Sequence, residues 1–470
     1  MKKVAIVYGR LQNDLQKRAI EELTSVLLDY VGEYPICVSY EQAADVIGER
    51  RCVYVGTKES HPYLLRNSVH KLSAAESYTI RVKDDEVIIE GYDDAGVLYG
   101  VLDFYNKYIV KYEHPTDAVL FWKNFFEEET LPEFEYSSAP SIKERGLWTW
   151  GHVIFDYRGY LYNMMRLKMN RVIIWNDFVP RNADEIVAYA HSCNIQVIWG
   201  FSWLWDTHAV TIARSFENLE GESERILEKY EREYAGAGGD GIYFQTFTEF
   251  KTETLNGVLI ADAASKFVNQ TAALFYEKYP DLEIQFGLHA TSVKQKLDYI
   301  KNVDPRIRIV WEDCGDFPFH YIHDCNEDFE ETRSFIRKAA LLRGKDDSFG
   351  VVTKGLMKLD WTRFKHLEGS QCLGVSSGDF RKTRFENKRR SWKYLQAGWL
   401  AYGDKAQDMI NEMYRLKNGA LSVVALVEDG VFEDEILYPV ALYSEMLWDC
   451  DAQLDTLIKE VSMREYVTFA

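Results

Sequence analysis

Residues 171–202 read RVIIWNDFVPRNADEIVAYAHSCNIQVIWGFS, and this stretch decides the fold class. Two β-rich runs, RVIIWND and IQVIWGFS, stand on either side of a helical pattern over NADEIVAYAHSCN. A short apolar strand, a helix and a second strand in this order predict a βαβ unit, in which both strands lie parallel in one sheet.

The same alternation of strand and helix continues along the chain from Lys143. It gives seven or eight units, and eight such units close into a (β/α)8 barrel of the TIM type. From 388 to 470 the pattern is helical, and this region either completes the barrel or packs beside it. The expected strands lie at 145–150, 171–177, 195–202, 241–249, 282–289, 307–313 and 348–355, with 372–377 as the candidate for the eighth.

The first part of the chain predicts a separate small α/β domain. KKVAIVY (2–8) reads as a strand, and a helical apolar period follows over 14–31. SYTIRV (77–82) and EVIIEG (86–91) form a hairpin pattern with Lys83, Asp84 and Asp85 at its turn. The fold class is therefore α/β, with a small α/β domain at 1–115, a linker at 116–142, the barrel at 143–387 and a helical region at 388–470.

Composition and charge exclude several classes of protein. The 470 residues are 47% hydrophobic and 27% charged, as in globular proteins. Acidic residues outnumber basic ones by 74 to 55, and the net charge of −19 repels nucleic-acid backbones and anionic membranes. No apolar run approaches the roughly 20 residues of a membrane span, and the seven cysteines lack CxxC spacing. We expect a cytoplasmic protein that binds neither nucleic acid nor membranes; a homo-oligomer stays open.

Aromatic and polar side chains gather at the ends of the expected strands, where a barrel carries its reactive groups. Indole faces stack on the apolar face of a pyranose, and carboxylates bind its hydroxyls or exchange protons with a glycosidic oxygen. The glycine-rich run at 236–241 precedes a strand, the wrong order for a dinucleotide fingerprint. A carbohydrate is thus favoured over a nucleotide. The candidate sugar-binding residues are Trp148, Trp150, Trp175, Asp177, Trp203, Trp205, His289, Trp311 and Lys354.

Cleavage of a glycosidic bond usually needs two carboxyl groups, about 5 Å apart for retention of configuration or about 6.5–9.5 Å for inversion. Glu249 is the first candidate, because it ends a largely apolar and β-branched run whose strand would deliver it to the barrel mouth as a general acid. Its partner is Glu312 or Asp313, two strands later. Alternation directs one of these two inward, and we favour Asp313 as nucleophile or base. All three also fit a helix cap or a partner for arginine.

Metal binding has one candidate cluster. His320 and His323 stand near Asp324 and Cys325, after the sixth expected strand. Zinc sites show tighter ligand patterns on defined elements. We therefore expect no metal and no cofactor.

Two segments resemble glycoside hydrolases. ESYTIRVKDDEVIIEGYDDAGVLYGVLDF (76–104) resembles the small α/β domain that precedes the barrel in family 20 β-hexosaminidases, family 67 α-glucuronidases and family 89 α-N-acetylglucosaminidases. PSIKERG (140–146) and MRLKMNRVIIWND (165–177) resemble the first barrel units of the same enzymes. The resemblance implies a glutamate acid at the end of the fourth strand, matched by Glu249. Family 20 enzymes place an aspartate before it, where this chain has Thr248.

Three functions are compatible with this pattern. The first is a glycoside hydrolase that removes a terminal sugar, with an N-acetylhexosaminide or a hexuronide as candidate substrate. The second is a barrel that binds carbohydrate without turnover, and the third is another barrel enzyme such as a lyase or a metal-dependent hydrolase. Two carboxyl groups converging on one pocket would favour the first.

Overall fold

The computed structural model describes residues 3–31, 34–48, 50–68, 71–110, 130–204, 218–247, 253–289, 293, 295–313, 329–356, 368–427 and 432–464. The chain divides into two compact units. The first comprises Met1–Pro140 with Ser192–Asn194 and Ser462–Ala470, and the second comprises Ser141–His191 and Ile195–Val461.

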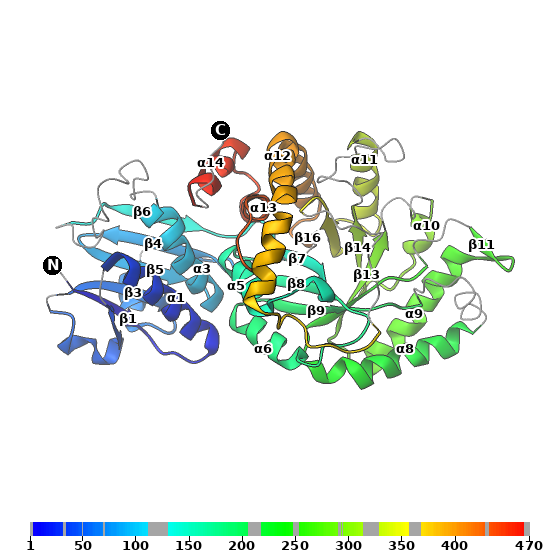
Figure 1. Ribbon diagram of the computed structural model, residues 1–470, viewed down its shortest axis with the longest axis horizontal. Helices are drawn as coiled ribbons and strands as arrows, with labels where there is room; N and C mark the ends of the chain where they lie inside the picture. Colours follow the sequence, from blue (N-terminus) through cyan, green and yellow to red (C-terminus); the bar gives the residue numbers. More distant parts are fainter. Residues whose placement is uncertain are drawn as a thin grey trace. The chain divides into compact units, whose positions relative to one another are not determined.

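A six-stranded mixed sheet forms the first unit, in the order β2-β1-β3-β5-β4-β6 (Figure 1). Strand β1 pairs in parallel with β2 and β3, β3 pairs in parallel with β5, and β4 pairs antiparallel with β5 and β6. The strand bounds are β1 (Val4–Tyr8), β2 (Ile36–Ser39), β3 (Arg51–Thr57), β4 (Tyr78–Lys83), β5 (Glu86–Gly91) and β6 (Phe134–Ser138). Strand β6 falls in the stretch expected to be a linker.

Helices of the first unit connect these strands. They are α1 (Asp14–Val31), α2 (Pro62–Asn67) and α3 (Asp94–Asp103), with a 3-10 helix η1 (Tyr40–Asp45) and a π-helical segment η2 (Phe104–Ile109). The hairpin of β4 and β5 forms where the sequence predicts it. Asp84 and Asp85 occupy its turn with φ of 50° and 70°, a conformation that aspartate tolerates.

Two glycines let α3 lie close to the sheet. A Cβ atom at Gly96 would lie 2.2 Å from the carbonyl oxygen of Ser77, and one at Gly100 would lie 2.9 Å from a methyl group of Ile89. Gly96 and Gly100, with Tyr99 between them, form a G…YG pattern within the segment 76–104 that carries the family resemblance. The pattern therefore reflects helix-to-strand packing in the small domain rather than chemistry.

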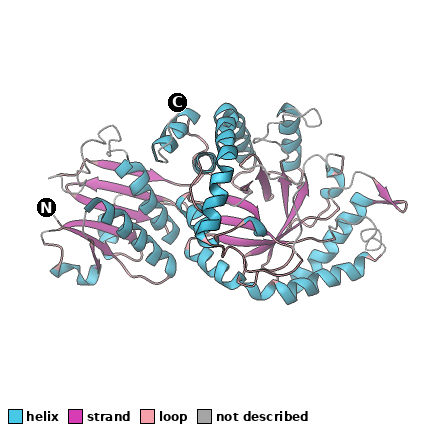
Figure 2. Ribbon diagram, viewed as in Figure 1, coloured by secondary structure: helices cyan, strands magenta, loops and turns pink. Residues whose placement is uncertain are grey.

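Eight parallel strands close the barrel of the second unit, in the order β10-β13-β14-β15-β16-β7-β8-β9 (Figures 1 and 2). This confirms the predicted (β/α)8 fold. The strands are β7 (Glu144–Trp150), β8 (Arg171–Trp175), β9 (Gln196–Gly200), β10 (Gly241–Phe244), β13 (Glu283–His289), β14 (Arg308–Glu312), β15 (Phe349–Thr353) and β16 (Leu421–Leu426).

The eighth strand is not the one that the sequence suggested. Residues 372–377 make only an isolated bridge between Val375 and Asp156 and lead into a long helix. Strand β16, in the region with a helical pattern, instead pairs with β15 and β7 and closes the barrel. Its run LSVVAL is short and continuously apolar, and such a run cannot be distinguished from a helical segment by periodicity.

Helices of the second unit cover the outside of the barrel (Figure 2). A small hairpin of β11 (Thr254–Leu255) and β12 (Val258–Leu259) precedes α9, and short 3-10 helices lie at η5 (Gly151–Val153) and η6 (Ala235–Ala237). The described α-helices from residue 157 onward are α5 (Tyr157–Arg166), α6 (Ala183–Ser192), α8 (Leu219–Glu233), α9 (Ile260–Lys278), α10 (Leu297–Ile300), α11 (Phe329–Ala340), α12 (Gly378–Leu416), α13 (Tyr438–Trp448) and α14 (Leu454–Arg464).

The N-terminal end of the barrel is closed by ion pairs. The guanidinium of Arg171 lies 2.6 Å from a carboxylate oxygen of Glu283 and 3.1 Å from one of Glu144. Arg308 bonds to the same two glutamates, at 2.8 Å from Glu283. All four charged residues stand at the starts of their strands, so this network lies at the end of the barrel opposite the predicted site residues.

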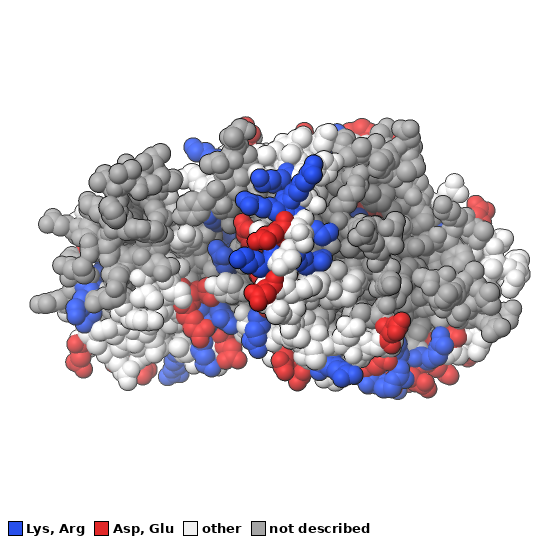
Figure 3. Space-filling model, in the orientation of Figure 1, with Lys and Arg blue, Asp and Glu red and all other residues white. Residues whose placement is uncertain are grey.

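The surface charge is uneven. Lys and Arg side chains gather over α12 on the face shown in Figure 3, although the whole chain carries a net charge of −19. Among the described residues, no helix is both long enough and apolar enough to cross a bilayer. The basic residues in the first half of α12 are Arg381, Lys382, Arg384, Lys388, Arg389, Arg390 and Lys393.

Candidate active site

Aromatic side chains fill the barrel interior toward its C-terminal end. Trp148 and Trp150 come from β7, Trp175 ends β8 and Tyr243 comes from β10, and all four are buried in one cluster. The ring of Trp148 lies 6.3 Å from that of Trp175 and 6.2 Å from that of Tyr243. Trp150 lies 5.7 Å from Trp175. Three of the predicted sugar-binding tryptophans are thus brought together.

A carboxylate stands beside this cluster. Glu312, at the end of β14, accepts hydrogen bonds at Oε1 from the hydroxyl of Tyr243 and the amide of Gln245. Its side chain is 6% exposed. Burial raises the pKa of Tyr243 well above its usual value, and the negative charge of Glu312 raises it further. The phenol therefore stays a hydrogen-bond donor.

The contact between Tyr243 and Glu312 depends on a glycine. Strand β13 lies between β10 and β14, and its Gly287 is level with this contact. A Cβ atom at Gly287 would lie 2.0 Å from the hydroxyl oxygen of Tyr243. The phenol therefore reaches Glu312 through space that any other residue would occupy.

Two further predicted residues stand at the ends of the two strands that flank β14. His289 is the register partner of Glu312 on β13, and it is partly exposed. Lys354 follows β15, in which Val352 is the register partner of Glu312, and it is also partly exposed. Because parallel strands end at the same edge of the sheet, both residues lie at the C-terminal mouth of the barrel.

Glu312 and Asp313 occupy opposite faces of their strand. The amide of Asp313 continues the β14 ladder with a 2.9 Å bond to the carbonyl of Val352, so side chains still alternate at this point. Glu312 faces the interior with Tyr243, and Asp313 is completely buried. The sequence favoured Asp313, whereas the hydrogen bonds identify Glu312 as the interior carboxylate; a catalytic role for either stays a prediction.

Two of the predicted tryptophans lie between the strands and the outer helices. Trp203 is fully buried and stacks on Phe244 at 3.7 Å and on Phe275 of α9 at 5.4 Å. Trp311 lies 6.2 Å from Phe335 of α11. The structure does not bring these two indoles together with the interior cluster.

The remaining predicted residues are Asp177 and several that lie outside the described part of the chain. Asp177 is partly exposed, and its backbone carbonyl accepts a 3.1 Å bond from Lys229. Glu249 and Trp205 lie outside the described residues, as does the cluster of His320, His323, Asp324 and Cys325. No group of three or more His, Cys, Asp or Glu side chains suited to a metal occurs among the residues that are described.

Comparisons with solved structures cover nearly the whole chain. A β-N-acetylhexosaminidase from Bacteroides fragilis matches 99% of this chain and 91% of its own length, with a TM-score of 0.56 and 12% identity. A GH115 4-O-methyl-α-glucuronidase with specificity for decorated arabinogalactans matches 99% of this chain, with a TM-score of 0.55 and 11% identity. A GH138 enzyme targeting pectin rhamnogalacturonan II matches 98%, with a TM-score of 0.55 and 12% identity.

The chain shares its fold with these three enzymes. At these identities the likeness establishes the fold, a small α/β domain followed by a barrel, as the sequence resemblance predicted. The chain spans 60% of the length of the GH115 enzyme and 52% of that of the GH138 enzyme. No protein-family description matches the chain, and no curated protein does.

A further carboxyl group was missed by sequence reasoning. Glu433 is 5% exposed, and its Oε1 accepts a 2.9 Å bond from the amide of Phe155. Its Oε2 is buried without a hydrogen-bond partner among the described residues. Burial raises the pKa of Glu433 to about 7, which would suit a proton donor. No sequence signal marks it, because its burial comes from residues far away in the chain.

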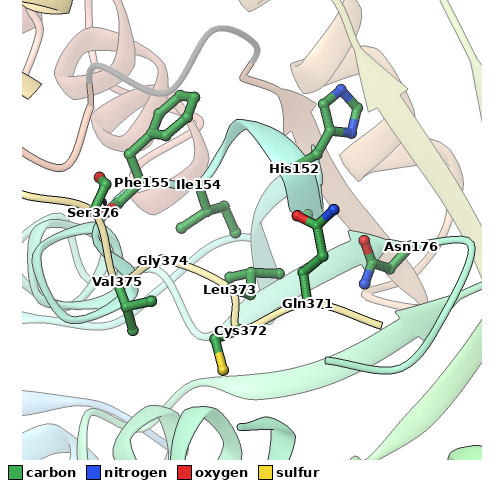
Figure 4. Close-up of a pocket in the computed structure, with 11 residues that line it drawn as sticks. His152, Ile154, Phe155, Asn176, Gln371, Cys372, Leu373, Gly374, Val375 and Ser376 are labelled. Atoms are coloured by element: carbon green, nitrogen blue, oxygen red, sulfur yellow. Dashed lines mark hydrogen bonds between the residues drawn. The ribbon is translucent and has the colours of Figure 1, made fainter. Parts of the chain in front are cut away.

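A cavity of about 250 Å³ opens at the same end of the barrel (Figure 4). Its walls come from the turn after β7, from Asn176 after β8, and from the segment 371–376. The sequence pointed to the loops after the strands, but not to this last segment. The lining residues are Gly151, His152, Ile154, Phe155, Asn176, Gln371, Cys372, Leu373, Gly374, Val375 and Ser376.

Proposed function

We propose that the chain is a glycosidase that hydrolyses the O-glycosyl bond of a terminal sugar. The observation that carries this proposal is the carboxylate of Glu312, held at the C-terminal end of the barrel by Tyr243 and Gln245 beside interior indoles. Carboxylates at this face carry the chemistry of barrel glycosidases. The fold shared with glycoside hydrolases supports the same proposal.

The two donors to Glu312 define which of its oxygens reacts. Tyr243 and Gln245 both donate to Oε1, and among the described residues no hydrogen bond reaches Oε2. We therefore assign Oε2 as the atom that attacks the anomeric carbon in a retaining reaction, or that removes a proton from water in an inverting one. The amide and the phenol hold the carboxylate plane in one orientation, which favours a single direction of attack.

Glu249 is the proposed general acid. It would give its proton to the glycosidic oxygen as the bond to the anomeric carbon breaks, and the leaving alcohol would carry that proton away. It stands shortly after Gln245 in the chain. Substrates of the structural neighbours include N-acetylhexosaminides and 4-O-methyl-glucuronides, and both classes are candidates here.

Release of chromophore from a panel of α- and β-aryl glycosides tests the proposal. We expect turnover of at least one member, and a fall of about a hundredfold or more in Glu312→Gln and in Glu249→Gln. The exposed Glu41 provides a control, Glu41→Gln, with unchanged rates. Full activity in Glu312→Gln together with loss in Asp313→Asn would contradict the assignment of Glu312.

A non-catalytic carbohydrate-binding barrel is the second candidate. It is favoured by the burial of Glu312 and by its hydrogen bonds within the barrel, since a structural carboxylate would make the same contacts. This function predicts thermal stabilisation by a sugar without turnover of any glycoside. The stabilisation would then persist in Glu249→Gln.

A further inference from the structure

The cavity beside the barrel mouth has a rigid wall. Segment 371–376 is fixed from both sides: the side chain of Asn182 exchanges two hydrogen bonds with the backbone of Leu373, at 2.9 and 3.0 Å. The carbonyl of Gly374 accepts a 3.1 Å bond from the amide of Tyr157. The hydroxyl of Ser376 donates a 2.6 Å bond to the carbonyl of Phe155. A site held open in this way needs little ordering when a ligand binds.

One polar atom of the wall lacks a partner. Asn176 is 4% exposed; its amide donates to the carbonyl of Phe178, while its Oδ1 has no hydrogen-bond partner among the described residues. Gly151 leaves the space beside this oxygen free, because a Cβ atom there would lie 2.5 Å from it. A buried acceptor without a donor marks a position where a ligand hydroxyl can bind.

The cavity has polar and apolar sides. Figure 4 shows His152, Asn176 and Gln371 gathered on one side, with Phe155 and Val375 on the other. This division suits a pyranose, which carries hydroxyls around its rim and an apolar face of C–H bonds. The volume of about 250 Å³ is below the roughly 300–1,000 Å³ of pockets for drug-sized ligands, so it suits a single ring.

The wall also indicates the charge of the ligand. None of the described residues that line the cavity is Lys, Arg, Asp or Glu. A uronate would need a cation or a set of donors aimed at its carboxylate. The lining therefore favours an uncharged sugar.

The cavity adjoins the aromatic cluster of the barrel. The ring of His152, in the cavity wall, lies 6.0 Å from that of Trp150, and Asn176 directly follows Trp175. We propose that this cavity is a subsite for one uncharged pyranose unit, next to the sugar processed at Glu312. The identity of the ligand rests on the proposed function. The substrate would then be a glycoside whose neighbouring unit is neutral.

Cys372 provides a probe that does not depend on turnover. It is an exposed free thiol in the cavity wall, and Cys37 of the first unit is an exposed free thiol as a control. The rate of iodoacetamide labelling at each thiol is measured by peptide mass spectrometry in the full chain. Methyl β-glucoside and methyl N-acetyl-β-glucosaminide are the neutral probes, and methyl β-glucuronide is the charged one.

We expect at least one neutral probe to slow labelling of Cys372 by threefold or more, with Cys37 unchanged and little protection by the glucuronide. Gln371→Ala, at an exposed position, and Asn176→Ala should each weaken the protection, while Glu312→Gln should retain it. Absence of protection by both neutral probes, or equal protection by the glucuronide, would overturn the proposal even if glycosides are hydrolysed. Protection without hydrolysis would support the subsite and count against the glycosidase.

Discussion

The hydroxyl of Tyr243, on β10, donates a hydrogen bond to the carboxylate of Glu312, on β14, across the intervening strand β13. Both side chains are buried in the barrel. Because burial and the negative charge of Glu312 raise the pKa of Tyr243 well above its usual value, the phenol keeps the proton that it donates. It therefore fixes the position of Glu312 without adding a titration step of its own.

Loss of the phenolic hydroxyl should impair turnover more than folding. In Tyr243→Phe the carboxylate of Glu312 keeps, within the described part of the chain, only the bond from Gln245, so its orientation is less restricted. We expect kcat to fall by about a hundredfold with KM little changed. The control is Tyr276→Phe, because the hydroxyl of Tyr276 is buried and makes no hydrogen bond to any residue that the structure describes. Equal kcat in the two variants would show that Tyr243 does not position a reacting carboxylate.

A methyl group at position 287 should displace the phenol. In Gly287→Ala the new Cβ would meet the hydroxyl of Tyr243 at 2.0 Å, so ring and carboxylate must both move. Overpacking of this kind costs about 1–3 kcal/mol of unfolding free energy. Activity should fall at least as far as in Tyr243→Phe. Gly236→Ala is the matched control, since a Cβ there meets no heavy atom within 4 Å. Urea unfolding and kcat/KM are measured for both variants. Similar unfolding free energies and similar kcat/KM values in the two would contradict a displacement of the phenol.

Most of the barrel could be predicted because its alternation of strand and helix is local. Strand β16 could not be predicted, because it follows α12 and its short apolar run has no periodicity that distinguishes a strand from a helix. The face of the strand that each tryptophan occupies could not be predicted either. Trp175 and Trp311 both stand near strand ends, yet one faces the interior and the other faces α11. A shift of register by one residue exchanges these faces, and the sequence does not determine it at a strand end.

The burial of Glu433 could not be predicted from the sequence either. Its burial depends on Phe155 and on Asn163, whose amide bonds to the neighbouring carbonyl of Phe432 at 2.7 Å, and these contacts join residues distant in the chain. No local pattern encodes them. The basic surface over α12 (Figure 3) differs in this respect: the local run 381–393 encodes it, although the net charge of −19 does not reveal it.

Removal of a charge from the closed end of the barrel should affect stability and leave catalysis intact. Burial opposes ionisation of Glu283, but the charges of Arg171 and Arg308 outweigh it and lower its pKa from the usual 4.5. Its stabilising effect is therefore present above pH 4.5 and is lost as the pH falls through the lowered value. Glu283→Gln should cost about 3 kcal/mol of unfolding free energy at pH 7, and the difference from the wild type should shrink in acid. Urea unfolding at pH 7 and in acid measures this difference in unfolding free energy. A kcat/KM that falls together with stability would show that this end of the barrel belongs to the active site.

Glu433 should make stability depend on pH in the opposite sense. Its pKa is about 7 in the folded chain, against 4.5 for an ordinary glutamate, because burial disfavours the charged form. The stabilisation from its neutral form is fully present below pH 4.5 and is lost as the pH rises through about 7. Glu433→Gln keeps an oxygen for the amide of Phe155 and cannot ionise. The variant should match the wild type near pH 5 and exceed it by about 1–3 kcal/mol near pH 8, measured by urea unfolding of the second unit. A constant difference between the two proteins at both pH values would mean that Glu433 ionises in the folded chain as it does in water.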